Sequence, residues 1–163
     1  MKPTRMLIAA AAALLLFTVP AARADESAQK KTMDTVREAL RTDKKALVAS
    51  TLQLTDAEAK AFWPIYDKYQ KELLTENNRL YQVIEEYALA YNKNKLDDAK
   101  ALDLVHRYFS AEAARSKVRS AYVDQFSNVL PGLKVARFYQ VENKLDAVVR
   151  YEMAERIPLM KQS

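Results

Sequence analysis

The sequence predicts an all-α protein, built as an elongated four-helix, hairpin-type subunit. Its 163 residues include a single glycine, Gly132, and no cysteine. So few turn-forming residues leave little room for β-hairpins. Ala, Leu, Lys, Glu, Gln and Arg dominate instead, and all of them are good helix formers. Apolar residues recur three and four positions apart, and the predicted helices span residues 28–50, 56–91, 97–129 and 133–156.

The first 24 residues have the pattern of a cleavable Sec-type signal peptide. A short basic region, Met1–Arg5, precedes a nearly unbroken apolar run over Met6–Val19. Pro20 ends the run, and Ala22-Arg23-Ala24 matches the small-x-small pattern of a signal-peptidase site. The run is short for a membrane span, and the cleavage site follows it closely. We therefore predict export to the periplasm, with an uncleaved N-terminal anchor as the alternative.

Residues 25–163 are predicted to form a single all-helical domain of 163 − 24 = 139 residues. Removal of the leader takes away three basic residues, so the net charge falls from +5 to about +2. Basic and acidic residues are interleaved without a basic block, which predicts no nucleic-acid partner. The lack of cysteine excludes disulfides, thiol nucleophiles and cysteine-based zinc sites.

The first two predicted helices have clear apolar faces. Residues 28–50 place Met33, Val36, Leu40 and Leu47 on one side. The next helix begins at Thr55 as its N-cap, and Glu58 three residues later completes a capping-box pattern. Its apolar seam consists of two series with seven-residue spacing. They are Phe62, Tyr69, Glu76, Val83 and Ala90, and Tyr66, Leu73, Leu80 and Tyr87.

Pro64 lies about two turns into this second helix. It lacks the amide proton that would bond to the carbonyl of Lys60, and its ring presses on that turn. We therefore predict that the helix over residues 56–91 is kinked near Lys60–Pro64.

The last two predicted helices are separated by the sharpest turn signal in the chain, Leu130-Pro131-Gly132. Before the third helix, Asn92 and Asn94 suit a turn, and Asp97 or Asp98 can cap the helix start. Its apolar face is assigned to Leu102, Val105, Phe109, Ala113, Tyr122 and Phe126. The fourth helix carries Val135, Phe138, Val141, Leu145 and Val148, and Pro158 marks its end.

Catalytic chemistry finds little support in the sequence. His106 is the only histidine, so a metal site or a Ser-His-Asp triad lacks its partners. Glu85 and Glu86 are neighbours, and neighbours on a helix point about 100° apart, which makes them poor co-ligands. One glycine cannot build a phosphate-binding loop. We predict no enzyme, no catalytic residue, no cofactor and no metal site.

Aromatic residues provide the positive signal. The chain has nine tyrosines and one tryptophan, and five of the tyrosines fall on the second predicted helix. Tyrosine suits half-buried surfaces and adaptable interfaces. Most of these side chains are expected in the intramolecular seam, and the rest in an interface with a second copy or a client protein, which makes a homodimer attractive. The candidate interaction surface is Trp63, Tyr66, Tyr81, Arg115 and Arg119.

Two helix starts repeat the same spacing. Leu54-Thr55-x-x-Glu58 is followed after three residues by Phe62-Trp63, and Leu130-Pro131-x-x-Lys134 is followed in the same way by Phe138-Tyr139. With these motifs, the chain resembles a distant relative of the Spy/CpxP-like group of periplasmic helical proteins, known for paired LTxxQ motifs. Glu58 stands where that motif has Gln, and Pro131 and Lys134 replace Thr and Gln in the second copy.

The resemblance implies a bent helical hairpin that pairs into a cradle-shaped dimer. It also implies that Leu54, Thr55, Leu130 and Pro131 are structural residues that help to lock the helix starts together. The expected function is an exported, ATP-independent binding protein that captures unfolded clients or assists envelope-stress signalling. One alternative is a dedicated accessory of a membrane sensor kinase. Another is a helical haem or metal carrier that uses His106 with Met33 or Met153.

Overall fold

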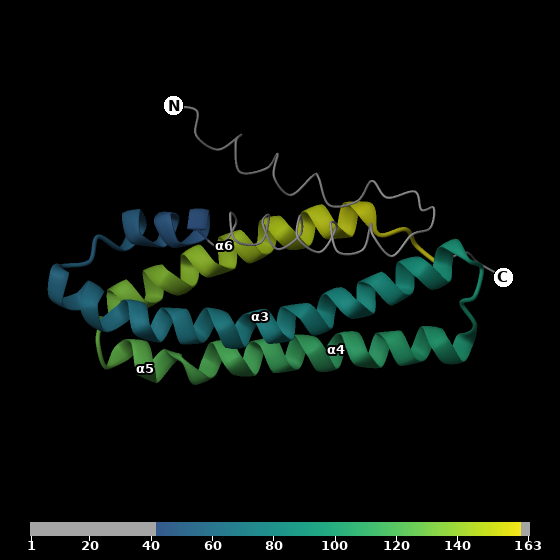
Figure 1. The fold of residues 1–163 in the computed structure, drawn as a ribbon, viewed down its shortest axis with the longest axis horizontal. Coiled ribbons are helices and arrows are strands. Elements are labelled where there is room, and N and C mark those ends of the chain that lie inside the picture. Colours follow the sequence, from purple (N-terminus) through teal and green to yellow (C-terminus); the bar gives the residue numbers. More distant parts are fainter. Residues whose placement is uncertain (1–41, 161–163) are drawn as a thin grey trace, which may run out of the picture. The chain divides into compact units, whose positions relative to one another are not determined.

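The computed structural model describes residues 42–160, and this part of the chain is helical and contains no strand. Residues 42–52 form a helix that is followed by α3 (Asp56–Asn92), α4 (Asp98–Ala121), α5 (Val123–Ser127) and α6 (Gly132–Arg156) (Figure 1). The all-α prediction is therefore confirmed. The predicted signal peptide and residues 28–41 of the first predicted helix lie outside the described residues.

The chain divides into two compact units. Among the described residues, one unit holds 42–53 and 138–155, and the other holds 54–137 and 156–160. The prediction of a single domain over residues 25–163 stays a prediction.

A buried carboxylate links the two segments that make up the smaller unit. Val48, Leu52 and Phe138 are buried in it, at 0–1% exposure. Glu142 on α6 is also buried, and Lys44 holds its two carboxylate oxygens with Nζ at 2.9 and 3.0 Å. A buried carboxylate needs such a cation, because removal of a charge from water is costly.

The helix over residues 42–52 ends two residues later than predicted. Gln53 takes a left-handed conformation with φ 46°, and its N–H donates to the carbonyl of Ala49 at 3.3 Å. A left-handed residue is the usual way to end an α-helix, although glycine is the commoner choice.

The start of α3 confirms the predicted capping box. Thr55 is the N-cap, and its Oγ1 accepts from the backbone N–H of Glu58 at 3.3 Å. In return, the N–H of Thr55 donates to Oε2 of Glu58 at 2.7 Å. Two amide protons that a helix start leaves unpaired are thereby satisfied.

Loss of this cap has a predictable effect. We expect Thr55→Ala to lower the free energy of unfolding by about 1 kcal/mol, because the N–H of Glu58 loses its acceptor. Thr75→Ala is the matched control, since Thr75 lies mid-helix and its Oγ1 bonds only to the carbonyl of Lys71. That control is expected to change stability by no more than a few tenths of a kcal/mol. Urea unfolding measures both, and equal losses contradict the role of the cap.

The helix α3 continues through Pro64 without a break. Pro64 and Lys60 are both exposed, so water can satisfy the carbonyl that proline leaves without a donor. Figure 1 shows α3 as one long, gently bowed rod. A kink localised near Lys60–Pro64 stays a prediction.

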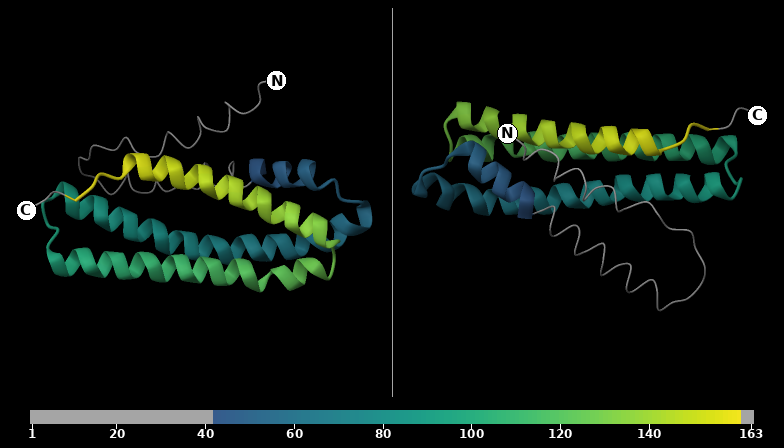
Figure 2. Two further views of the ribbon diagram at one scale, coloured as in Figure 1. Left: turned by 180° about the vertical axis from the view of Figure 1, so that it is seen from behind. Right: turned by 90° about the horizontal axis from the view of Figure 1, so that it is seen from above.

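Helices α3 and α4 form an antiparallel hairpin, and they lie side by side in the views of Figures 1 and 2. In the turn between them, Asn94 is left-handed with φ 50°, a conformation that Asn tolerates well. Asp97 then caps α4 through a 2.7 Å bond from the N–H of Lys100. The predicted seam of α3 is confirmed at six of its nine positions, where Phe62, Tyr66, Tyr69, Leu73, Leu80 and Val83 are buried. Glu76, Tyr87 and Ala90 are half-buried.

The face of α4 that packs in this hairpin differs from the prediction. Its buried residues are Leu104, Ala111 and Arg115. The predicted face is mostly exposed instead, with Leu102, Val105 and Phe109 at 60%, 44% and 65%. One of the buried positions is an arginine, Arg115, and a search for apolar periodicity does not mark such a position. Only Tyr122 and Phe126 of the predicted face are buried.

The predicted helix over residues 97–129 is interrupted at Tyr122, which separates α4 from α5. The backbone there has φ −92° and ψ −6°, outside regular α-helical geometry. The side chain of Tyr122 is buried, and its hydroxyl donates to Oε1 of Glu72 on α3 at 2.6 Å. Burial, together with this carboxylate, raises the pKa of Tyr122 to about 12. Tyr122 therefore ties the junction of α4 and α5 to α3.

An aromatic cluster closes this end of the hairpin. The ring of Phe126, with 0% exposure, lies 5.3 Å from Phe62, 5.8 Å from Tyr69 and 6.1 Å from Tyr122 between ring centroids. Such distances are typical of favourable aromatic pairs. The cluster packs α5 and the end of α4 against α3.

At the other end of the chain, α6 stops at Arg156, two residues before Pro158, as predicted. The carbonyl of Pro158 accepts a hydrogen bond from the hydroxyl of Tyr87 on α3 at 2.6 Å. Within residues 42–160, no helix combines the length and the apolar character that a bilayer span requires.

Candidate interaction surface

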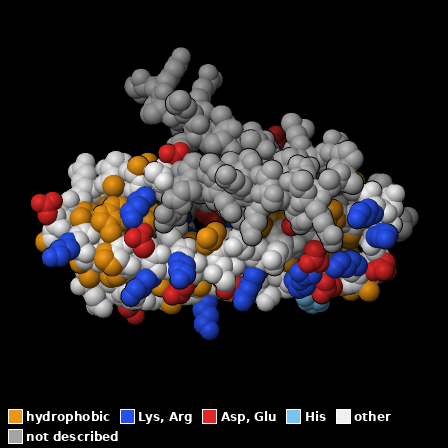
Figure 3. All heavy atoms as spheres, in the orientation of Figure 1, with side chains coloured by type: hydrophobic (Ala, Val, Ile, Leu, Met, Phe, Trp, Pro, Cys, Tyr) orange, Lys and Arg blue, Asp and Glu red, His pale blue; other side chains and the backbone are white. Residues whose placement is uncertain are grey.

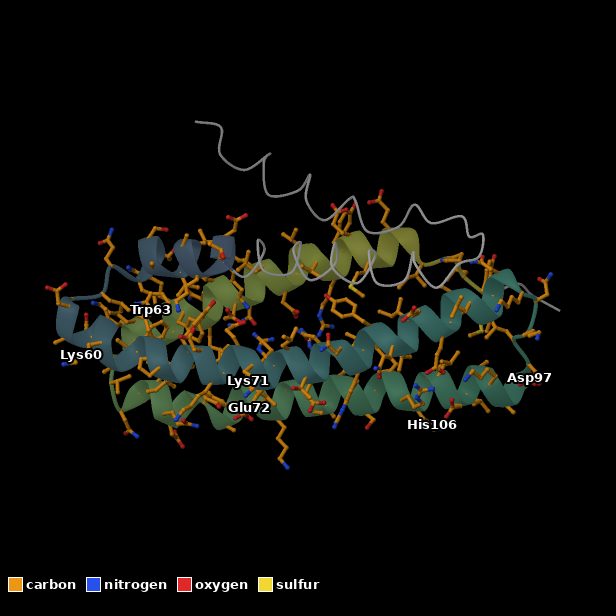
Figure 4. All side chains as sticks on the ribbon, in the orientation of Figure 1. Lys60, Trp63, Lys71, Glu72, Asp97 and His106 are labelled. Carbon is orange, nitrogen blue, oxygen red and sulfur yellow. The ribbon has the colours of Figure 1, made fainter. Side chains whose placement is uncertain are left out.

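The described residues contain no cluster of side chains that could hold a catalytic metal ion. Among them, no three His, Cys, Asp or Glu side chains lie close enough together to hold an ion. His106 is exposed on the side of α4 that faces away from α3 (Figure 4). The side chain that the carrier alternative requires thus points to solvent.

The two repeated helix starts meet through an ion pair. Nζ of Lys134 lies 2.6 Å from Oε2 of Glu58, so the last positions of the two five-residue motifs bind each other. This hydrogen bond is the main cause that lowers the pKa of Glu58. Glu58 therefore has two partners, the N–H of Thr55 at its own helix start and Lys134 at the start of α6.

The remaining motif residues support the same helix starts. Leu130 is buried and Leu54 is half-buried. The carbonyl of Pro131 accepts from the N–H groups of Lys134 and Val135 at 2.8 and 3.1 Å, which begins α6. Each motif also carries an edge-to-face aromatic pair, with centroids 5.0 Å apart for Phe62–Trp63 and 5.1 Å apart for Phe138–Tyr139.

The predicted interaction surface is wrong at two residues, because the side chains of both are buried. Tyr66 has 1% exposure and lies in the seam of α3. Arg115 is also buried, with its Nε 2.6 Å from Oδ1 of Asn77 and its NH1 2.9 Å from Oε1 of Glu112. An arginine can enter a core when its donors are met by a carboxylate and an amide in this way. Neither side chain is available to a partner.

The other three predicted surface residues differ in exposure. Tyr81 is 43% exposed on α3, whereas Trp63 and Arg119 are half-buried. The ring of Trp63 packs edge-to-face on Tyr66 at 5.3 Å between centroids. The role of these three residues in binding stays a prediction.

A mainly apolar stripe on α4 was missed as a surface. Leu102, Val105 and Phe109 are spaced three and four residues apart, so they share one face of the helix. Exposed Ala113 and Ser116 continue the same face. We call these five residues the outer stripe. The sequence shows the stripe plainly, but it was assigned to the inside of the hairpin.

An ion-pair network fixes the turn end of the hairpin. Glu86 of α3 receives two hydrogen bonds from Arg107 of α4, at 2.6 and 2.7 Å, and one from Lys100 at 3.0 Å. Arg107 also lies 3.4 Å from Asp103. The hydrogen bonds from Arg107 and Lys100 lower the pKa of Glu86 to about 2. Glu86 therefore links α3 to α4.

This low pKa predicts a specific pH dependence. Since the pKa of Glu86 is lower in the folded than in the unfolded chain, its ion pairs stabilise the fold above about pH 4. Their contribution is lost as the pH falls towards 2. We expect Glu86→Gln to lower stability at pH 6 and to show a smaller further loss in acid than the parent protein. Unfolding between pH 2 and 6 measures this, and Glu85→Gln, at the exposed neighbour, is the control.

The charges elsewhere on the molecule are mixed. On the visible part of the face in Figure 3, Lys and Arg side chains alternate with Asp and Glu, without a block of one sign. This agrees with the interleaved charges of the sequence.

The outer stripe and the ion pair between the two helix starts are features of the structure itself. The likeness to Spy/CpxP-like proteins stays a prediction that rests on the two motifs. No family model matches the chain, and neither does any curated protein or solved structure.

Proposed function

We propose that this chain is an exported, ATP-independent helical binding protein that captures unfolded or partner proteins in the periplasm. The outer stripe of α4 is the observation that supports this proposal. Leu102 and Phe109 are each at least 60% exposed and stand about two helical turns apart. A soluble helix that leaves such side chains in water along one face is typical of a surface that binds another protein.

The chemistry of the stripe suits reversible capture. Apolar side chains in a row bind apolar segments of many sequences, and neighbouring charges keep the free surface soluble. Exposed Asp98 and Lys117 stand at its two ends. No nucleotide is needed for a cycle of this kind, because weak apolar contacts release the client spontaneously. The working form in this proposal is a homodimer.

Suppression of aggregation tests the proposal. We expect a several-fold molar excess of the protein to keep a chemically denatured client in solution without ATP. Leu102→Ser is expected to weaken this effect. Leu133→Ser is the matched control, since Leu133 is 88% exposed on α6 and lies outside the stripe. Aggregation that proceeds unchanged at all ratios, or equal loss in both variants, contradicts capture by the stripe.

A further inference from the structure

The outer stripe offers side chains to a partner but no backbone groups. It lies inside α4, which continues to Ala121 without proline or glycine. The N–H and carbonyl groups along the stripe are therefore paired within the helix itself. An extended segment placed on this surface gives up water from its own backbone groups and finds no replacement for it, which is costly. A helical segment brings its backbone hydrogen bonds with it.

The shape of the stripe also suits a helix. Its three large apolar residues have the three- and four-residue spacing by which one helix packs on another. The ring of Phe109 makes an edge-to-face contact with half-buried Tyr108, at 5.5 Å between centroids, which holds the largest side chain of the stripe in place. Ala113 and Ser116 follow, and such small residues let a second helix approach closely. The stripe rises about 21 Å along α4, so a helix of about fifteen residues covers it.

One edge of the stripe is polar and ends in a cation. His106, Ser110 and Lys117 are exposed and stand four and seven residues apart, so they follow one line along α4. His106 points away from α3 (Figure 4). Asp103, three residues before it, is bound to Arg107 at 3.4 Å. Among the described residues, no carboxylate pairs with Lys117. This edge therefore favours a carboxylate on the partner.

We infer that the outer stripe binds an amphipathic helix of a partner protein, with carboxylates beside its apolar face at the end that meets Lys117. This inference rests on the proposed function, because it names the class of segment that the same surface captures. Asp98, exposed one turn before the stripe, disfavours carboxylates at the opposite end. The partner helix therefore lies along α4 in one direction.

The size of the contact sets its strength. A stable interface buries about 800 Å² per partner, which is more than one helix gains on a single convex stripe. We therefore expect reversible binding, with a dissociation constant in the micromolar range or weaker. Spontaneous release of the partner follows from the same weakness.

Two fluorescent peptides, each of about sixteen residues, test the helical conformation. Both carry leucines at helical spacing on one face and a pair of glutamates near one end. They differ at a single central position on the polar face, which is alanine in one and proline in the other. The proline peptide is expected to bind about ten-fold more weakly or worse, because proline removes a helical hydrogen bond and presses on the preceding turn. Fluorescence anisotropy measures both, and equal binding overturns the inference.

Substitutions in the protein test the place of binding. Leu102→Ser is expected to weaken binding of the alanine peptide about ten-fold, because a large apolar contact at the stripe is lost. Leu133→Ser, at a residue with 88% exposure on α6, is the matched control and is expected to leave binding unchanged. If Leu102→Ser binds the peptide as the parent protein does, the helix does not lie on the stripe and the inference fails.

A third peptide tests the charge preference. It carries two lysines in place of the two glutamates, and the parent protein is expected to bind it about three- to five-fold more weakly. Lys117→Gln is expected to remove most of this difference. Lys144→Gln, at an exposed lysine of α6 outside the stripe, is the control and is expected to keep it. A Lys117→Gln protein that still prefers the glutamate peptide to the same degree contradicts the role of this edge.

Failure of the inference and failure of the proposed function are distinguishable. A protein that suppresses aggregation through Leu102 but binds the alanine and proline peptides equally retains the proposed function and loses the helical partner. A protein that binds the alanine peptide through the stripe but suppresses no aggregation retains the inference and loses the proposed function.

Other occupants of the stripe give different results. Vesicles of anionic phospholipid that bind the protein, when none of the peptides does, identify a membrane surface as the occupant. A dimer that Leu102→Ser dissociates, again without binding of any peptide, identifies a second copy. Either result overturns the inference.

Discussion

Replacement of Phe126 by alanine is expected to lower the free energy of unfolding by about 3–5 kcal/mol, the largest effect of any single change considered for the hairpin of α3 and α4. The ring is fully buried and contacts three other aromatic rings, those of Phe62, Tyr69 and Tyr122. Its removal loses their contacts and leaves a cavity that rigid neighbouring rings cannot easily fill. Equilibrium unfolding in urea, followed by circular dichroism, measures the loss.

The chain provides a matched control for this change. Phe109 lies on α4, the helix that precedes α5, but is 65% exposed. Phe109→Ala is expected to change stability by no more than about 0.5 kcal/mol when measured at concentrations where the protein is monomeric. If the two alanine variants lose similar stability, burial in the aromatic cluster does not explain the effect at Phe126.

Replacement of Arg115 by alanine is expected to cost about 3 kcal/mol. The guanidinium is buried between the helices and satisfies Asn77 and Glu112. Its loss leaves Glu112 without the cation beside it and creates a cavity where the apolar stem of the arginine packed. Both effects act on the same face of α4, so the variant is also expected to lose protection from hydrogen exchange along that helix.

Two further variants separate the contributions at this position. Arg115→Met restores most of the volume but not the charge, so about half of the loss is expected to return. Arg79→Ala removes an arginine whose side chain is 63% exposed and whose pair with Glu76 measures 2.9 Å. Exposed pairs of this kind contribute less than about 1 kcal/mol. A loss at Arg79 equal to that at Arg115 contradicts the special role of the buried site.

Residues with short-range signals were predicted best. Thr55 and Glu58 lie three positions apart, and the capping box follows from local chemistry alone. The seam of α3 was also predicted, because Phe62, Tyr69 and Leu73 are large, apolar and spaced for a helix.

The packing face of α4 could not be read in the same way. Its buried positions are occupied by Leu104, Ala111 and Arg115, which are a single large apolar residue, a small one and a cation. The more apolar face, with Leu102 and Phe109, faces solvent. Periodicity locates the most apolar face of a helix, but which face packs is decided by partners such as Asn77 on another helix.

The candidate interaction surface was predicted incorrectly for the same reason, because contacts with other helices decide which side chains are buried. Tyr66 was chosen because tyrosine suits interfaces, and Arg115 was chosen for its spacing along the helix, yet the fold buries both. Conversely, the pairing of Glu58 with Lys134 depends on two residues 76 positions apart. The repeated spacing of the two helix starts hinted at their relation, but the opposite charge at the last position of the two motifs was the more direct signal.

The polar contacts between the helices also imply the order in which the helices pair during folding. Their sequence separations rise steadily from the turn: 14 residues for Lys100–Glu86, 38 for Arg115–Asn77, 50 for Tyr122–Glu72 and 76 for Lys134–Glu58. Closure of a short loop costs less chain entropy than closure of a long one, so we expect the helices to zip together from Asn94 outwards. Substitutions near Glu86 then slow folding, whereas substitutions near Phe126 chiefly accelerate unfolding.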